Sequence, residues 1–263
     1  MTNRALLKSL EAICQKAGAF IREENTRIST RDIEFKGRND LVSYVDKQAE
    51  QMLVSELQKL LPEAGFLTEE GTVVQADEDQ TRWIIDPLDG TTNYLHGIPT
   101  YAVSVALERA GELQIGVVYE IGQNELFSAA RGEGASLNGR TLEVSREKDL
   151  AEGLFATGFP YKDFAKLEGF NKTLSYFFRH TRGMRRLGSA ATDLAYVAAG
   201  RFAGFYEYGL APWDVAAGIL LVQEAGGRIS DFSGGDNFLH GGEIIAAADS
   251  IFADFQKVIL SEL

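Results

Sequence analysis

The sequence has few cysteines, prolines and basic side chains. Its 263 residues include one cysteine, Cys14, and five prolines. A single cysteine cannot form an internal disulfide, which excludes a disulfide scaffold and is typical of a reducing compartment. Basic residues number 26 against 38 acidic ones, so the formal net charge is −12. Nucleic-acid binding is therefore not expected, because it needs a clustered basic face.

Long apolar runs are also absent. No uninterrupted apolar stretch approaches the roughly 20 residues of a membrane span, and residues 1–18 lack the compact apolar run of a signal peptide. We therefore expect a cytoplasmic protein with no membrane partner. The composition, 45% apolar and 24% charged, is that of an ordinary soluble globular protein.

The spacing of apolar residues predicts the secondary structure. Apolar side chains recur every three or four residues from 3 to 24, which predicts an amphipathic helix, and a second helix is expected from a capping Asp46 to Leu60. Strand-like alternation begins at Trp83, and Asn138-Gly139 predicts a hairpin. Further helices are expected near 161–179, 190–199, 214–225 and 249–262, and further strands near 153–158, 202–207 and 243–248.

The order of these elements predicts the fold class. Helices come first, a strand-rich stretch follows, and mixed elements end the chain without regular βαβ alternation. This order indicates a layered α/β (α+β) structure. No Pro/Ser-rich linker interrupts the chain, so we expect one domain over 1–263. A division into halves, an α+β half at 1–150 and an α/β half at 151–263, is an open alternative.

The most informative segment is WIIDPLDGTTN, which runs from Trp83 to Asn93. An apolar strand delivers Asp86 at its carboxyl end, where α/β folds bind their ligands. Pro87 then turns the chain, so that Asp89 can come beside Asp86. Two adjacent carboxylates repel each other, and the arrangement makes sense if a divalent cation lies between them. Taken alone, a structural turn capped by both aspartates is the alternative interpretation.

The residues that follow favour an anion next to this cation. Gly90 lets a ligand approach the backbone, and Thr91-Thr92 can open a short helix whose free N–H groups attract negative charge. The segment therefore predicts adjoining cation and phosphate sites.

Two other segments carry acidic residues of the same kind. Glu69-Glu70 follows an apolar pair, and Asp214 follows Pro212-Trp213. Alone, the first is usually a solvated surface pair and the second a helix cap. Together with the aspartates of the main segment they supply four or five carboxylates without histidine or cysteine. Oxygen-only ligands favour Mg²⁺, Mn²⁺ or Ca²⁺ over zinc.

These motifs carry a family resemblance. The run Asp86–Asn93, followed by Trp213-Asp214 and Glu224–Gly227, resembles the inositol monophosphatase family of Mg²⁺-dependent, lithium-sensitive phosphatases. The resemblance extends from the first helix to about residue 248. It implies an αβαβα sandwich of the sugar-phosphatase type and a homodimer. It also implies hydrolysis of a small phosphorylated cyclitol or sugar, inositol 1-phosphate first, by water activated at two or three Mg²⁺ ions, with Mn²⁺ as a substitute.

The resemblance also assigns roles to single residues. The implied metal ligands are Glu69, Asp86, the Leu88 carbonyl, Asp89 and Asp214. The implied catalytic residues are Thr91, Asp46 and Glu69, of which Asp46 and Thr91 would orient the attacking water. The implied substrate contacts are Gly90, Thr91, Gly188, Ser189, Ala190, Glu207 and Asp214. Tyr94 replaces a more usual phenylalanine, whose packing its ring can still provide.

Other interpretations stay open at this point. Relatives of the same fold act on fructose 1,6-bisphosphate, histidinol phosphate or 3′-phosphoadenosine nucleotides, although Thr92-Asn93 resembles the inositol branch more than the nucleotide branch. A phosphatase that forms an aspartyl-phosphate would space its aspartates as D-x-D, whereas two residues separate Asp86 and Asp89. A regulatory binding protein with secondary phosphatase activity is a third possibility. The basic cluster Arg182, Arg185 and Arg186 is interpreted as plain surface or a subunit contact, with a phosphate-steering patch as the alternative.

Overall fold

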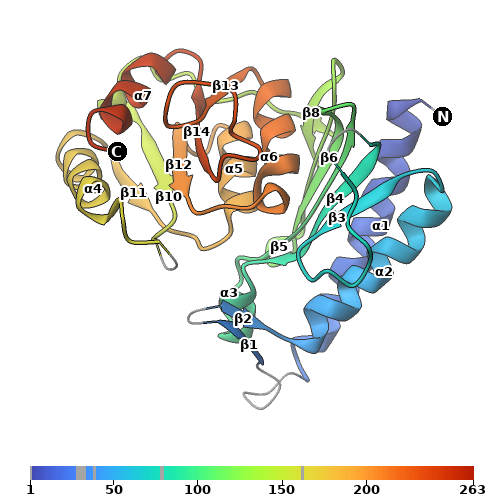
Figure 1. Cartoon of the computed structure of the whole chain (residues 1–263). Coiled ribbons are helices and arrows are strands. Elements are labelled where there is room, and N and C mark those ends of the chain that lie inside the picture. The colour runs from blue at the N-terminus through green and yellow to red at the C-terminus, as the bar shows by residue number, and fades with distance from the viewer. Residues whose placement is uncertain (1, 28–33, 38–39, 78–79, 161–162) are drawn as a thin grey trace.

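The structure is a computed structural model that describes residues 2–27, 34–37, 40–77, 80–160 and 163–263. Helices and sheets alternate in five layers, αβαβα (Figure 1). From one side to the other these layers are α1 (Asn3–Glu24) with α2 (Tyr44–Leu60), a seven-stranded sheet, α5 (Ala190–Ala198) with α6 (Pro212–Glu224), a five-stranded sheet, and α4 (Leu167–His180) with α7 (Phe252–Leu260). The predicted layered sandwich is therefore confirmed.

The seven-stranded sheet keeps the order of the sequence. Its strands are β3 (Gly65–Thr68), β4 (Arg82–Asp89), β5 (Ala102–Arg109), β6 (Glu112–Glu120), β7 (Glu125–Ala130), β8 (Gly134–Leu137) and β9 (Arg140–Thr141). Only the pair β3–β4 is parallel. Side chains alternate between two buried faces: Val103, Val105 and Leu107 of β5 join the core under α1 and α2, and Ala102 and Ala106 join the core under α5 and α6.

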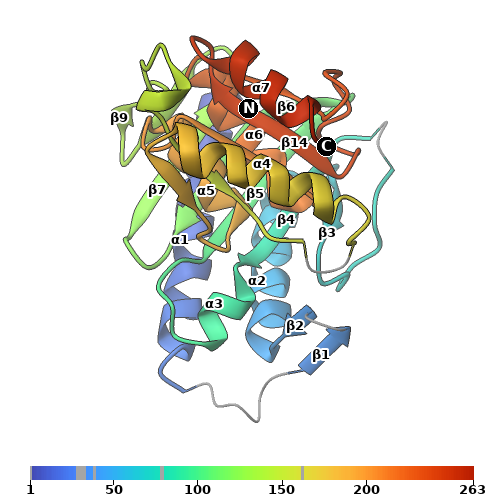
Figure 2. The same cartoon turned by 90° about the vertical axis from the view of Figure 1, so that its left-hand side faces the viewer.

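The five-stranded sheet has crossover connections. Its order is β11 (Gly183–Arg185), β10 (Leu154–Thr157), β12 (Gly204–Tyr208), β14 (Glu243–Ala248) and β13 (Gly227–Ser230), and a short 3₁₀ turn, Leu150–Glu152, precedes β10. A core rich in aromatic rings lies between its outer face and the helices α4 and α7. Figure 2 shows α4 crossing this outer face.

Most expected elements are found. The helix from 3 to 24 is confirmed, and the Asn138-Gly139 hairpin joins β8 to β9 with both residues at positive φ. One helix start was predicted wrongly, because α2 begins at Tyr44 after the N-cap Ser43, and Asp46 is its third residue. Four strands of three or four residues, β1 (Glu34–Gly37), β3, β11 and β13, were not predicted, because the sheet around such short segments decides their conformation.

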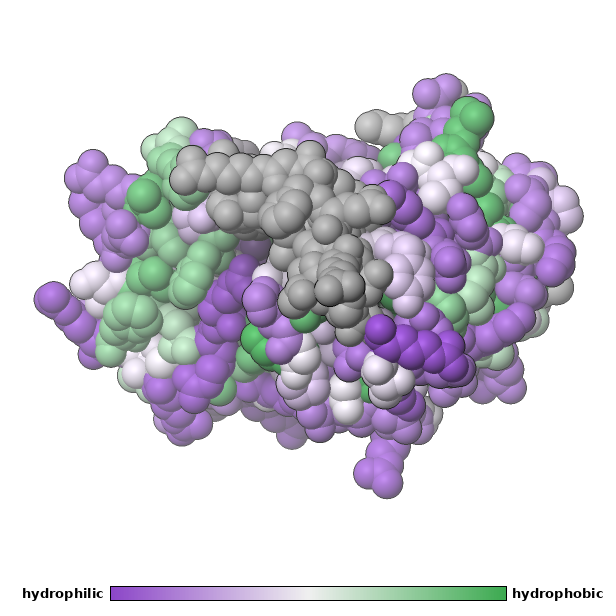
Figure 3. Space-filling view, turned by 90° about the horizontal axis from the view of Figure 1, so that it is seen from below, coloured by the Kyte–Doolittle hydropathy of each residue, from purple (hydrophilic) through white to green (hydrophobic). Residues whose placement is uncertain are grey.

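The small hairpin of β1 (Glu34–Gly37) and β2 (Asp40–Val42) lies at the same end of the molecule as α3 (Thr91–Leu95) (Figure 1). From this end, Figure 3 shows mainly hydrophilic side chains, with an apolar area on the side of α4. Phe178 of α4 and Phe164, which precedes α4 in the chain, are exposed apolar residues. Within the described residues, no helix combines the length and the apolar character that crossing a membrane requires.

Candidate active site

A cavity of about 450 Å³ brings the predicted residues together. Its walls come from the end of β3, the β4–α3 segment, the start of α5, β12 and the start of α6. Eleven predicted residues line it: Glu69, Asp86, Leu88, Asp89, Gly90, Thr91, Gly188, Ser189, Ala190, Glu207 and Asp214. The twelfth, Asp46, is buried and does not line the cavity. Segments from both sheets therefore meet at one site.

The β4–α3 segment has the turn that Pro87 predicts. The pairing of β4 with β5 shifts register between Asp86 and Asp89, and the Leu88 N–H donates to Asp86 Oδ1 at 2.9 Å. Gly90 precedes α3 with φ at +94°, a conformation that side-chain-bearing residues rarely adopt. The structural turn and the convergence of carboxylates are thus both present, because one aspartate organises the turn while both line the cavity.

Asp89 connects this segment to the other half of the cavity. Its Oδ2 accepts hydrogen bonds from the Ser189 hydroxyl and from the Ala191 N–H, both at 2.7 Å. These donors lie at the start of α5, where a carboxylate is favoured by the unpaired N–H groups. Nearby, the Asn93 side-chain amide donates to the Thr100 and Leu187 carbonyls at 2.8 and 2.7 Å. The first half of the site is therefore tied to the helix that builds the second half.

Thr91 and Asp46 form a hydrogen-bonded pair behind the cavity wall. The Thr91 hydroxyl lies 2.8 Å from Asp46 Oδ1 and 2.9 Å from the Leu88 carbonyl oxygen. The other carboxylate oxygen of Asp46 accepts from the Ser43 N–H and hydroxyl. Burial raises the pKa of Asp46, and the bonds from Ser43 and Thr91 oppose this rise. The hydroxyl of Thr91 is thus held in a fixed position at the cavity edge.

Two helix starts place acidic residues by the same device. Asp214 is the third residue of α6, and its Oδ2 accepts from the Ala211 N–H at 2.7 Å. Asp46 bonds the N–H that precedes α2 in the same way. Asp214 therefore caps the start of α6 as predicted, but from the third helical position and not from the N-cap, which is Ala211.

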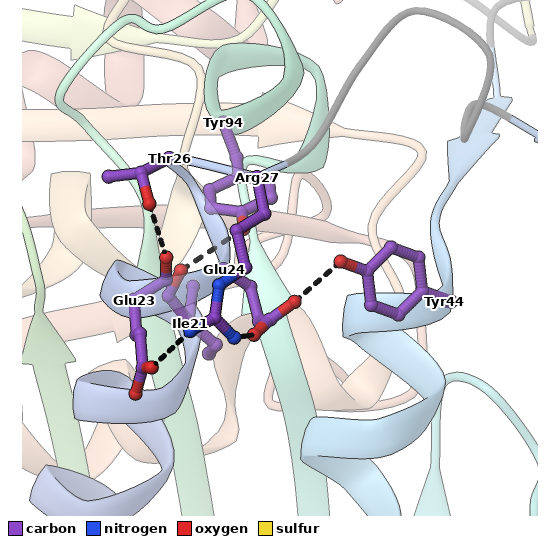
Figure 4. A network of polar contacts seen from close by, with 7 residues as sticks. All are labelled: Ile21, Glu23, Glu24, Thr26, Arg27, Tyr44 and Tyr94. Carbon is purple, nitrogen blue, oxygen red and sulfur yellow. Dashed lines mark hydrogen bonds and ion pairs between the residues drawn. The ribbon is translucent and has the colours of Figure 1, made fainter.

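Figure 4 shows how the end of α1 supports this region. The Tyr44 hydroxyl from α2 and the Arg27 guanidinium both donate to the Glu24 carboxylate, at 2.6 Å each. The Tyr94 hydroxyl from α3 donates to the Ile21 carbonyl at 3.0 Å. The hydroxyl that distinguishes Tyr94 from phenylalanine thus ties α3 to α1, while its ring is fully buried as predicted.

The carboxylates of the cavity raise one another's pKa values. Burial raises the pKa of Asp86 well above its ordinary value, and the charges of Glu69, Asp89 and Asp214 raise it further. Burial, with Asp89 and Glu69, does the same to Asp214. Burial also raises the pKa of Asp89 to about 6, against the opposing bonds from α5. A positive charge near these groups would favour their ionised forms.

These donors fit a hard divalent cation. They are carboxylates and a backbone carbonyl, without nitrogen or sulfur, and their mutual repulsion is what a cation relieves. They are arranged around the cavity rather than closed into a cluster: within the described residues, no group of three or more His, Cys, Asp or Glu side chains forms a compact metal-ligand set.

The end of the cavity at β12 holds three residues outside the predicted site set. Beside Glu207 lie Asp193 of α5, Gly158 and Arg186, all of which line the cavity. Burial raises the pKa of Glu207 to about 8, which the nearby Arg186 charge lowers and Asp89 raises. A Cβ at position 158 would lie 1.8 Å from Glu207 Oε1, so a larger residue there would displace the Glu207 carboxylate. Arg186 is exposed, as a surface residue is expected to be, and it also lines the cavity, which agrees better with the alternative of a phosphate-steering patch.

Comparison with known proteins gives a consistent result. The model of the inositol monophosphatase family matches residues 2–260. Inositol-1-monophosphatase of Mesorhizobium japonicum is 42% identical over 263 residues, covering 100% of this chain and 99% of the relative. Nus factor SuhB of Escherichia coli is 44% identical over 232 residues, covering 88% and 87%.

Solved structures agree with the sequence relatives. The extragenic suppressor protein suhB from Bartonella henselae superimposes with a TM-score of 0.93 at 40% identity, covering 98% of this chain and 100% of the other. The family match over nearly the whole chain and these identities lead to one conclusion. The chain belongs to the inositol monophosphatase family.

Proposed function

We propose that this chain is a Mg²⁺-dependent phosphatase that hydrolyses inositol 1-phosphate. The main observation in support of this proposal is that one cavity is lined by four acidic residues from three separate segments of the sequence: Glu69, Asp86, Asp89 and Asp214. Family membership supports the reaction, because relatives such as that of Mesorhizobium japonicum are named inositol-1-monophosphatase.

The same carboxylates and the Leu88 carbonyl would hold two or three Mg²⁺ ions, with Mn²⁺ as a substitute. When bound, such ions supply a hydroxide-like nucleophile and neutralise charge on the attacking and leaving oxygens of a phosphate monoester. The support is the chemistry of the proposed ligands, which are carboxylate and carbonyl oxygens without nitrogen or sulfur. Lithium sensitivity is expected on family membership alone.

The chain's own groups would orient the reactants. Asp46 accepts the Thr91 hydrogen, which leaves the hydroxyl oxygen of Thr91 free to accept a hydrogen bond from the attacking water. The backbone of Gly90 and Thr91 would hold the phosphoryl oxygens, since Gly90 allows close approach. Glu69 would share in activating the water.

The second half of the cavity would select the alcohol part of the substrate. Gly188, Ser189, Ala190 and Glu207 line it, together with Asp214. A carboxylate such as Glu207 accepts hydrogen bonds from hydroxyl groups, which suits a polyhydroxylated cyclitol or sugar. This chemistry supports inositol 1-phosphate but suits sugar phosphates as well.

A panel of esters tests the proposal. Purified protein with Mg²⁺ should release phosphate from inositol 1-phosphate with a higher kcat/KM than from fructose 1,6-bisphosphate, histidinol phosphate or a 3′-phosphoadenosine nucleotide. Asp86→Asn should lower kcat/KM by more than about 100-fold, because a buried charged ligand is lost. The exposed Asp254→Asn is the matched control. An Asp86→Asn protein as active as the wild type would refute the proposal.

A regulatory role is the second candidate, because relatives at 44% identity are named Nus factor SuhB. It does not conflict with catalysis, since the acidic residues of the cavity are all present. An Asp86→Asn protein that still complements a strain lacking its own copy would support this role. Failure to complement would restrict the function to hydrolysis. Homodimer formation and cytoplasmic location stay predictions.

A further inference from the structure

A buried carboxylate outside the predicted set holds the loop that carries Glu69. Glu50 lies on α2 and is fully buried. Its oxygens accept three hydrogen bonds: from the Glu70 N–H at 2.7 Å, from the Thr72 N–H at 2.7 Å and from the Thr72 hydroxyl at 2.6 Å. Bonds to a buried ionised acceptor are about twice as strong as neutral ones. Glu50 therefore holds the peptide N–H groups of Glu70 and Thr72 in this loop.

These bonds hold the backbone on the far side of Glu69. The parallel pairing of β3 with β4 ends at Thr68. The Glu69 N–H still reaches the Ile85 carbonyl at 3.2 Å, and the next N–H, that of Glu70, turns to Glu50. Successive peptide groups around Glu69 are thus anchored to different elements, β4 on one side and α2 on the other.

The same helix holds the other side of the cavity. Asp46, one turn before Glu50 on α2, accepts the Thr91 hydroxyl at 2.8 Å. Two carboxylates on one helix face therefore hold two separate loops, one with Glu69 and one with the β4–α3 turn. The bond from Tyr44 to Glu24 anchors the start of α2 to α1 (Figure 4). Helix α2 therefore contacts both loops, in addition to the pairing of β3 with β4 that joins them directly.

We propose that Glu50 is a positioning residue, which fixes Glu69 for cation binding by holding the peptide groups that follow it. This rests on the proposed function, in which Glu69 is a metal ligand. A ligand held in place before binding costs less entropy to order, so metal affinity rises. The site requires an acceptor-only group, because three donors point at it. A glutamine of the same size would turn an NH₂ group toward at least one of them.

The variants Glu50→Gln and Thr72→Val test this, with Thr72→Ser as the conservative variant that keeps the hydroxyl. Glu56→Gln on the same helix is the matched control, since Glu56 bonds only the surface lysines Lys16 and Lys59 among the described residues. The readouts are Mg²⁺ binding by calorimetry on chelator-stripped protein, amide hydrogen exchange of residues 69–72, and kcat at saturating Mg²⁺.

We expect Glu50→Gln to raise the Mg²⁺ dissociation constant by about 10-fold or more, in the range of other residues that support metal ligands. Exchange of the 69–72 amides should quicken, while kcat at saturating Mg²⁺ stays within about threefold of the wild type. Thr72→Val should show the same pattern more weakly. Thr72→Ser and Glu56→Gln should match the wild type.

An unchanged dissociation constant with faster exchange would overturn the inference, and so would a fall in kcat at saturating Mg²⁺ without a change in affinity. If Glu50→Gln does not fold, an unchanged affinity in Thr72→Val overturns it equally. A wild-type chain that binds no Mg²⁺ would instead overturn the proposed function, and this inference with it. The two failures are therefore distinguishable by the wild-type titration.

Discussion

Replacing Glu207 by glutamine should change stability in a pH-dependent way. Glu207 lies on β12 with 9% of its surface exposed, and burial raises its pKa from 4.5 to about 8. Between these two pH values the folded chain holds a proton at Glu207 that the unfolded chain has released. The free energy of unfolding therefore falls as pH rises from about 4.5 to about 8, and the loss is complete above pH 8.

The size of the effect follows from the two pKa values. Because the pKa rises from 4.5 to about 8 on folding, ionisation of Glu207 lowers the free energy of unfolding by at most about 5 kcal/mol. Glutamine carries no charge and keeps nearly the same volume, so Glu207→Gln abolishes this loss. The variant should unfold like the wild type near pH 4 and be more stable by up to about 5 kcal/mol at pH 9.

Urea unfolding in a chelating buffer at pH 5, 7 and 9 measures this difference. The exposed Glu63→Gln serves as the control, and its effect should stay below about 0.5 kcal/mol at every pH. In contrast, kcat/KM for inositol 1-phosphate should fall in Glu207→Gln, because one of the two acceptor oxygens is replaced by an NH₂ donor. A stability difference that does not grow between pH 5 and pH 9 would refute the reasoning.

Two further substitutions probe the same end of the cavity. Burial and the Glu207 charge raise the pKa of Asp193 well above its ordinary value, and Asp193 Oδ1 has no hydrogen-bond partner among the described residues. Asp193→Asn should therefore raise the free energy of unfolding at pH 8 by about 1–3 kcal/mol in urea titrations, whereas a loss of stability would contradict this. Gly158→Ala should displace the Glu207 carboxylate, with a stability cost of about 1–3 kcal/mol and a raised KM for inositol 1-phosphate. Unchanged kinetics in Gly158→Ala would show that the carboxylate position does not matter.

Local patterns were sufficient to predict most of the fold. Helix α1 has a regular apolar face, and Asn138-Gly139 has the dipeptide that a tight hairpin needs, so both follow from short-range rules. The strand β11 has only three residues and pairs in parallel with β10, which lies about thirty residues earlier in the chain. No local signal marks such a segment, because its partner determines its conformation.

In the candidate site, too, some residues could be predicted from the sequence and others could not. The aspartates of the β4–α3 segment lie in one contiguous motif, and this motif, together with Glu69, Asp214 and the family resemblance, was enough to select them. Glu50 carried a weaker signal that was not used: it follows Ala49 on the buried face of α2, where a charged residue needs partners. Those partners, in the 69–72 loop, lie about twenty residues later, so only the folded chain reveals them.

Contacts that join the two sheets also build the site, and this explains why so many polar groups can be buried there. Asp89 accepts from the Ala191 N–H at the start of α5, and the Asn93 amide donates to the Leu187 carbonyl, so polar groups on each side of the junction are paired across it. A buried polar junction is stable only while its hydrogen bonds are complete. Side chains of the β4–α3 segment therefore hold the junction between the two halves of the cavity. A substitution in this segment is expected to change both the position of Asp86 and Asp89 and the position of α5 relative to them.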